Sequence, residues 1–247
     1  MGSRRGSRDL SERGVIVNVQ HMNDNEREVS IPVGTGAEVY GTLRVPPAAR
    51  GLVIFAHGSG SSRRSPRNRF VAEVLERDGF ATLLMDLLTE REAIVDDRTR
   101  EYRFDILFLA ERLALVTGAA HLSEAADLPI GYFGASTGAA AALVAATRSA
   151  PDVAAIVSRG GRPDLAGEAL AFVRAPTLFI VGSADPVVLQ LNREARSRMR
   201  ALTELVTVQG ATHLFEERGA LERVARLAHN WFVRYLTNLP SPAVKQI

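Results

Sequence analysis

IGYFGASTGAAAALVAATR, at residues 130–148, joins a short apolar run to an alanine-rich segment through the pattern Gly-x-Ser-x-Gly. The apolar run is too short and too uniform for an amphipathic helix, so it predicts a strand buried on both faces of a parallel sheet. The alanine-rich segment predicts a helix packed closely against that sheet. Gly134 and Gly138 would let neighbouring backbones pass a strained turn that presents the Ser136 hydroxyl above the sheet. Ser136 is therefore the candidate nucleophile.

The same alternation extends through the rest of the chain. Further apolar runs lie near residues 52–56, 80–85, 153–157, 177–181 and 205–208. Helical patterns lie between them, at residues 66–78 after a capping Ser65, at 103–116, and at 221–235 with apolar residues at i, i+3, i+4 and i+7. Before them, segments 29–33 and 38–45 predict an antiparallel hairpin. Together these patterns predict an α/β fold: a mostly parallel sheet with helices on both faces.

The domain organisation follows from composition. The polar, arginine-rich residues 1–26 predict a flexible tail, residues 27–239 a single α/β domain, and residues 240–247 a second tail. The connection at residues 159–175 is too short for a large cap domain. The 247 residues carry 30 cations and 28 anions, a net charge of +2 that the first thirteen residues account for. A neutral folded body argues against a nucleic-acid groove.

Several classes of protein are disfavoured by what the sequence lacks. It has no Cys, which excludes disulfides, thiolate zinc sites and a cysteine nucleophile. It has no apolar stretch of about 20 residues and no apolar leader. We expect a cytoplasmic monomer or homodimer with a small-molecule substrate, and no membrane or nucleic-acid partner, metal or cofactor.

A serine hydroxyl needs a base, and five histidines are available. His213 follows the last strand on a short, glycine-led loop, where it could reach across the sheet to Ser136; the alternative is a histidine that only packs the loop. His57 opens the loop after the first parallel strand. The remaining three lie in the predicted tail, in a polar connection and on the polar side of the last helix: His21, His121 and His229.

The base needs an acid to fix its tautomer, and the oxyanion of the intermediate needs donors. Asp185 follows the strand near 177–181 and is the candidate acid, with Asp164 and Asp86 as fallbacks. Its alternative role is the N-cap of a helix that begins at Pro186. The N–H groups of Thr137 and Ser59 are the candidate oxyanion donors. The glycine- and serine-rich loop that holds Ser59 could instead be a simple turn.

Four segments together resemble a known family: HGSGSS at 57–62, GASTG at 134–138, GSAD at 182–185 and GATHLFE at 210–216. They are similar to α/β-hydrolases of the dienelactone hydrolase-like group, and in particular to the hydrolase domain sometimes fused to a phosphoribosyltransferase. The resemblance spans about residues 27–237 and implies an eight-stranded sheet with the triad Ser136, Asp185 and His213. Dienelactone hydrolase itself uses a cysteine nucleophile, so the absence of Cys favours serine esterase chemistry here.

The sequence thus predicts a serine hydrolase that cleaves a small ester or lactone through an acyl-enzyme. An acyltransferase or thioesterase would use the same residues, and a non-catalytic ligand-binding module is a further alternative. Arginines crowd the predicted mouth of the site: Arg63, Arg64, Arg67, Arg159 and Arg162. We predict that Arg159, with Arg63 and His57, contacts the substrate and that the arginines bind a carboxylate or phosphate. The alternative is compositional bias, since Lys245 is the only lysine.

Overall fold

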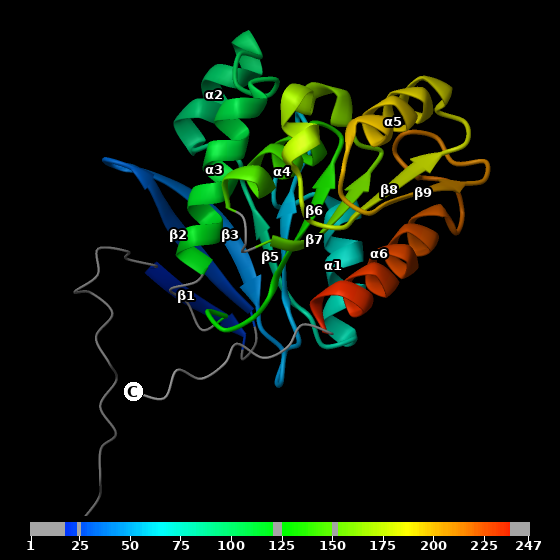
Figure 1. The fold of residues 1–247 in the computed structure, drawn as a ribbon. Coiled ribbons are helices and arrows are strands. Elements are labelled where there is room, and N and C mark those ends of the chain that lie inside the picture. The colour runs from blue at the N-terminus through cyan, green and yellow to red at the C-terminus, as the bar shows by residue number, and fades with distance from the viewer. Residues whose placement is uncertain (1–17, 24–25, 121–124, 150–152, 238–247) are drawn as a thin grey trace, which may run out of the picture.

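The computed structural model describes residues 18–23, 26–120, 125–149 and 153–237, which form one nine-stranded sheet with helices on both faces (Figure 1). The strand order is β1-β2-β3-β5-β4-β6-β7-β8-β9, and β4 to β9 are mutually parallel. The strands are β1 (Asn18–Asn23), β2 (Glu26–Gly34), β3 (Ala37–Arg44), β4 (Leu52–Ala56), β5 (Ala81–Met85), β6 (Ile130–Ala135), β7 (Val153–Arg159), β8 (Thr177–Gly182) and β9 (Thr203–Val208). The helices are α1 (Pro66–Arg77), α2 (Glu90–Thr99), α3 (Ile106–Ala120), α4 (Thr137–Arg148), the 3-10 helix η2 (Pro163–Phe172), α5 (Pro186–Arg198) and α6 (Ala220–Leu236).

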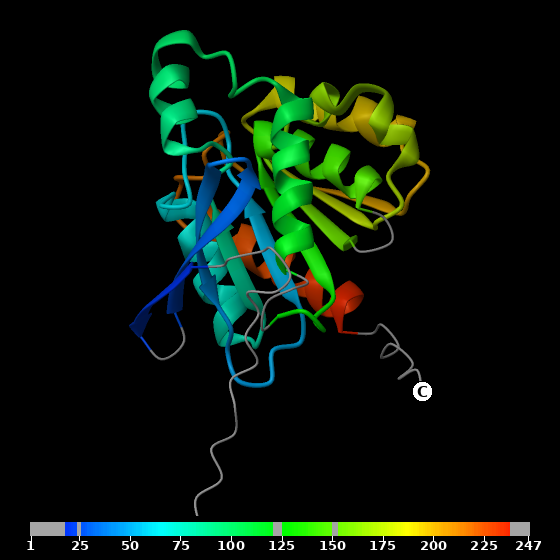
Figure 2. The ribbon, with the colours of Figure 1, turned by 90° about the vertical axis from the view of Figure 1, so that its left-hand side faces the viewer.

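Each central strand feeds two hydrophobic cores, because successive side chains point to opposite faces of the sheet. In β4, Leu52 and Ile54 join the core beneath α3 and α4, whereas Val53 and Phe55 join the core beneath α1 and α6. Figure 2 shows the two helical layers on either side of the sheet. The central apolar runs are therefore uniformly apolar because both faces are covered.

The predicted fold class is confirmed, and most elements lie where the sequence places them. Helix α1 begins as expected, with the Ser65 hydroxyl accepting a hydrogen bond from the Asn68 N–H at 3.4 Å and Pro66 in the first turn. Helix α4 covers residues 137–148, as predicted. Helix α3 begins at Ile106, three residues later than predicted, and no large cap domain covers the sheet in the parts of the chain that the structure describes.

Four expectations need correction. The sheet has nine strands and not eight, because residues 18–23 of the predicted tail pair with β2 as strand β1. Residues 1–17 and 240–247 lie outside the described residues. Strand β9 is not buried on both faces: it pairs only with β8 at the edge of the sheet. Helix α2 was not predicted. Within the described ranges, no helix is long and apolar enough to cross a membrane.

Candidate active site

Ser136 occupies the sharp turn between β6 and α4. Its backbone angles, φ 51° and ψ −120°, are strained for a residue with a side chain. A Cβ at Gly134 would lie 2.4 Å from the Ala139 Cα, and one at Gly138 would lie 2.3 Å from the carbonyl oxygen of Ala56. Both glycines are thus required by the close passage of neighbouring backbones, and the turn they allow holds Ser136 at the carboxyl end of the sheet.

The loops after β8 and β9 are held together by their backbones. A Cβ at Gly182 would lie 2.1 Å from the carbonyl oxygen of Ala211, and that oxygen accepts a hydrogen bond from the Ala184 N–H at 2.9 Å. Because the loops approach so closely, Asp185 at the end of one meets His213 at the end of the other. The distance from Asp185 Oδ2 to His213 Nδ1 is 2.8 Å.

Asp185 also caps helix α5. Its Oδ1 accepts a hydrogen bond from the Val188 N–H at 3.4 Å, while its Oδ2 faces His213. The N-cap and the contact with the imidazole, which the sequence offered as alternatives, therefore coexist in one carboxylate. The cap anchors the side chain, which leaves the second oxygen aimed at His213.

Ser136 and His213 line one cavity of about 210 Å³, which we call the catalytic cavity. Because Nδ1 of His213 is held by Asp185, its Nε2 is the ring nitrogen left to act as a base. The serine is fixed from the neighbouring strand as well: its N–H donates to the carbonyl oxygen of Arg159 at 3.2 Å. The structure thus brings the three predicted triad residues to one end of the sheet.

The two fallback acids are engaged elsewhere. Asp164 accepts two hydrogen bonds from Arg162, at 2.8 and 2.7 Å. Asp86 pairs with Arg63 and accepts the Arg63 backbone N–H at 2.7 Å. Neither carboxylate contacts His213, so Asp185 is the acid that the geometry places there.

The loop after β4 supplies the second predicted oxyanion donor. Ser61 N–H donates to the Gly58 carbonyl oxygen at 3.2 Å, which closes a turn whose third residue, Gly60, has φ +68°. The turn lies against the nucleophile, since a Cβ at Gly58 would be 3.0 Å from Ser136 Cβ. In the described part of the chain, no protein acceptor takes the N–H of Ser59 or of Thr137. Both amides are free to bind an anion near the N-terminus of α4.

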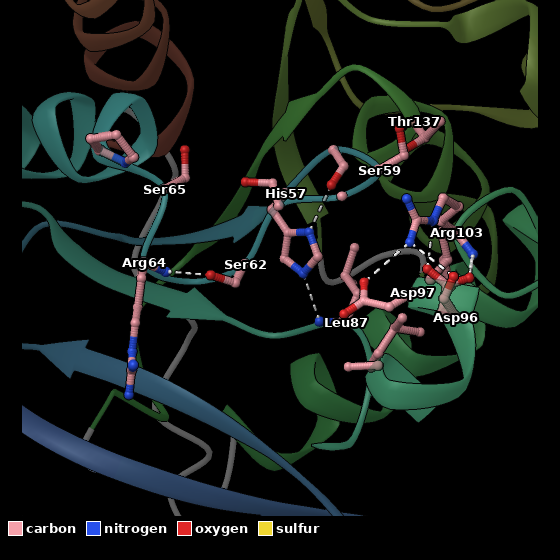
Figure 3. Close-up of a pocket in the computed structure, with 17 residues that line it drawn as sticks. His57, Ser59, Ser62, Arg64, Ser65, Leu87, Asp96, Asp97, Arg103 and Thr137 are labelled. Carbon is pink, nitrogen blue, oxygen red and sulfur yellow. Dashed lines mark hydrogen bonds and ion pairs between the residues drawn. The ribbon is translucent and has the colours of Figure 1, made fainter. Parts of the chain in front are cut away.

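Ser59 and Thr137 line a second and larger cavity of about 430 Å³ (Figure 3). We call it the α2 cavity, because residues of α2 form part of its wall. It shares residues Gly58, Ser59, Ser61 and Ser65 with the catalytic cavity. Apolar side chains Leu87, Leu88, Ala93 and Leu109 also line it. The two cavities are therefore adjacent, with the oxyanion loop between them.

Helix α2 and the start of α3 are joined by a buried ion pair. Asp96 is 3% exposed and accepts hydrogen bonds from Arg103 Nε at 2.6 Å and from the backbone N–H groups of Tyr102 and Arg103, both at 2.9 Å. Although burial opposes it, these bonds lower the pKa of Asp96, which stays charged. The only sequence signal for α2 is Thr89-x-x-Glu92, which forms a reciprocal capping box.

His57 does not act as the substrate contact that we predicted. Its Nδ1–H donates to the Gly58 carbonyl oxygen at 2.9 Å, and its Nε2 accepts the Leu87 N–H at 3.0 Å (Figure 3). Burial lowers the pKa of the imidazole, which keeps the ring neutral. With both nitrogens occupied by backbone groups, His57 ties the oxyanion loop to the end of β5.

The two predicted anion-binding arginines differ. Arg63 makes ion pairs with Asp86 and Glu28 and lines neither the catalytic cavity nor the α2 cavity, so the prediction for Arg63 is wrong. Arg159 lines the catalytic cavity beside Ser136 and His213. Among the described residues, no group of three His, Asp or Glu side chains is arranged to hold a metal ion.

Comparison with known proteins agrees with this geometry. The profile of the Dienelactone hydrolase family matches residues 39–236. The chain belongs to the dienelactone hydrolase family. A dienelactone hydrolase from Anabaena variabilis has 52% sequence identity and a TM-score of 0.84, over 88% of this chain and 99% of that one. Est1E from Butyrivibrio proteoclasticus shares the fold at 17% identity, with a TM-score of 0.70 over 84% of this chain and 98% of its own.

Two relatives of this dienelactone hydrolase family member carry a different name. Two Mycobacterium tuberculosis proteins, from strains CDC 1551 and H37Rv, are each called "Putative phosphoribosyl transferase" and are 53% identical over 97% of this chain. The chain spans about half of their length, 53%. This agrees with the resemblance to a hydrolase domain fused to a phosphoribosyltransferase. The family and the fold are those of hydrolases.

Proposed function

We propose that this chain is a serine hydrolase that cleaves a small ester or lactone through an acyl-enzyme. One observation carries the proposal: the hydrogen-bonded pair of Asp185 and His213 meets the strained Ser136 at a single cavity. A strained serine turn, an oriented imidazole and two free backbone donors are the components that acyl transfer requires.

In the proposed reaction, His213 Nε2 takes the hydroxyl proton as Ser136 Oγ bonds to the ester carbonyl carbon. The N–H groups of Thr137 and Ser59 hold the negative oxygen. The bond from carbon to the leaving oxygen then breaks, and His213 gives its proton to that oxygen. Water activated by the same imidazole releases the acid and restores Ser136.

Active-site labelling tests this proposal. A fluorophosphonate probe should modify Ser136, and the protein should hydrolyse 4-nitrophenyl butyrate. The substitution Ser136→Ala should remove the adduct and lower kcat by about 10⁴- to 10⁶-fold. Ser149→Ala, at the other end of helix α4, is the matched control for loss of a serine hydroxyl. Folded wild-type protein with neither adduct nor hydrolysis would favour a non-catalytic binding module.

The name of the mycobacterial relatives describes proteins about twice as long as this chain. We assign the hydrolase reaction to the half that this chain matches. Transfer of the acyl group to an acceptor other than water would use the same residues, and product analysis with added alcohols and thiols separates a hydrolase from an acyltransferase.

A further inference from the structure

Arg159 is a buried cation without a partner. The residue is 7% exposed, and its Nε is buried with no hydrogen-bond acceptor. Across the described residues, its guanidinium takes part in no hydrogen bond or ion pair; its one recorded contact is with the Phe215 ring, 5.8 Å from the ring centroid. An uncompensated buried charge destabilises a fold, so its presence in the catalytic cavity points to a ligand that supplies the opposite charge.

The surroundings of Arg159 also favour an anion. Arg67 lines the same cavity, and burial together with repulsion from Arg67 lowers the pKa of Arg159 to about 10, so that it remains protonated at neutral pH. Arg67 is itself paired with Glu216 at 2.9 Å, but that carboxylate lies outward, with 64% of its side chain exposed. The cavity therefore carries an excess of positive charge on its buried side.

The position of Arg159 relative to the triad indicates which part of the substrate it meets. Its carbonyl oxygen accepts the Ser136 N–H, and a Cβ on the next residue, Gly160, would lie 3.6 Å from His213 Cε1. His213 must protonate the leaving oxygen, so the leaving group has to lie in the cavity that His213 lines. Arg159 lines that cavity, whereas Thr137 lines the α2 cavity.

We propose that Arg159, assisted by Arg67, forms a subsite for a carboxylate or phosphate carried by the leaving group of the ester. The acyl part then extends past the oxyanion donors into the α2 cavity. The planar guanidinium can hold two oxygens of either anion, which a lysine cannot. This inference rests on the proposed serine hydrolase activity, and it adds the chemical class of the substrate.

Three chromogenic esters locate the anion. 4-Nitrophenyl butyrate is neutral, 3-(butanoyloxy)-4-nitrobenzoate carries a carboxylate on its leaving group, and mono-4-nitrophenyl glutarate carries one on its acyl group. We expect the leaving-group carboxylate to raise kcat/KM relative to the neutral ester. Arg159→Met should reduce that ratio by about 10- to 100-fold, the range of a lost charge-assisted hydrogen bond. A ratio unchanged by Arg159→Met, or a loss confined to the glutarate ester, would overturn the proposal.

Two further variants exclude trivial explanations. Arg69→Gln removes the same charge from an exposed position on α1 that lines a different cavity, and it should leave the ratio intact. Glu216→Gln frees Arg67 from its ion pair and should raise the ratio a few-fold. A merely structural role for Arg159 predicts equal losses on all three esters and no gain from Glu216→Gln, and that result would also refute the subsite.

The source of the anion is decided by 2-(butanoyloxy)ethyl phosphate against 3-(butanoyloxy)propanoate, with butyrate release as the readout. The ester with the larger Arg159-dependent kcat/KM identifies phosphate or carboxylate as the preferred group. If no ester is hydrolysed, the proposed function fails, and the subsite is tested separately. Calorimetry with 3-hydroxy-4-nitrobenzoate should then show binding to the wild type that weakens about 10-fold or more in Arg159→Met; equal binding would refute the subsite.

Discussion

The two cavities that share the oxyanion loop treat charge in opposite ways. In the α2 cavity, the buried Asp96 is neutralised by Arg103, and apolar side chains form much of the remaining wall. In the catalytic cavity, Arg159 is equally buried but has no carboxylate beside it in the described chain. A charge satisfied within the protein serves structure, whereas a buried charge left unsatisfied is available to a ligand. The contrast predicts an apolar acyl subsite on one side and an anion subsite on the other.

The largest expected effect is on the chemistry that both cavities share. Asp185→Asn should lower kcat/KM by about 10⁴-fold on every ester, because the imidazole loses the carboxylate that fixes its tautomer. The fold should be retained, since Asn can still cap α5 through the Val188 N–H. Ester hydrolysis assays with short, long, neutral and anionic substrates provide the measurement.

Asp164→Asn is the matched control for Asp185→Asn, because Asp164 pairs with Arg162 and does not contact His213. Its activity should stay within a few-fold of the wild type. A loss as large as that of Asp185→Asn would show that the acid was assigned to the wrong residue.

A second effect concerns the wall of the α2 cavity. Asp96→Asn should lower the free energy of unfolding by about 3 kcal/mol, because it leaves Arg103 without its buried partner. The lowered pKa of Asp96 means that its stabilisation is present above the ordinary value of 3.8 and is lost as the pH falls through the lower folded value. Urea denaturation at pH 7 and at lower pH measures both effects.

The neighbouring Asp97 provides the control for Asp96. Its side chain is 82% exposed and lies 3.4 Å from the same arginine. An exposed pair contributes little, so Asp97→Asn should change stability by less than about 1 kcal/mol. If both substitutions destabilise equally, burial is not what gives the Asp96 pair its effect.

Sequence reasoning located what depends on local pattern. The elbow at Ser136 could be predicted because its glycines and flanking apolar run are contiguous, and Asp185 and His213 could be predicted because each follows an apolar strand. It misassigned Arg63 and His57, whose partners, Glu28, Asp86 and Leu87, are distant in sequence or are backbone groups. Only the folded structure shows which cations are neutralised, and therefore that Arg159 is the one left for a ligand.

Helix α2 escaped prediction for a related physical reason. Its residues are strongly polar, and the contacts that hold it in place are formed only when α3 packs beside it, through Asp96 with Arg103 and Glu92 with Arg112. Weak local propensity is overridden by such tertiary contacts. The wall of the α2 cavity is thus specified by pairs of charges, which an apolar periodicity does not reveal.

The smallest expected effect tests whether the α2 cavity holds the acyl group. Ala93 lines it from α2, so Ala93→Phe should fill part of its volume. Esters with a common 4-nitrophenyl leaving group and acyl chains of two to eight carbons give the readout. The ratio of kcat/KM for octanoate to that for acetate should fall about 10-fold, the range of a lost apolar contact.

Ile94→Phe makes a similar change at the next residue, whose side chain is 61% exposed and does not line the cavity, and it should leave the chain-length profile as in the wild type. If Ala93→Phe instead lowers the preference for the leaving-group carboxylate, the two cavities have been assigned to the wrong halves of the substrate. A profile unchanged in both variants would place the acyl chain outside the α2 cavity, because a buried phenyl ring occupies space that a long chain would need.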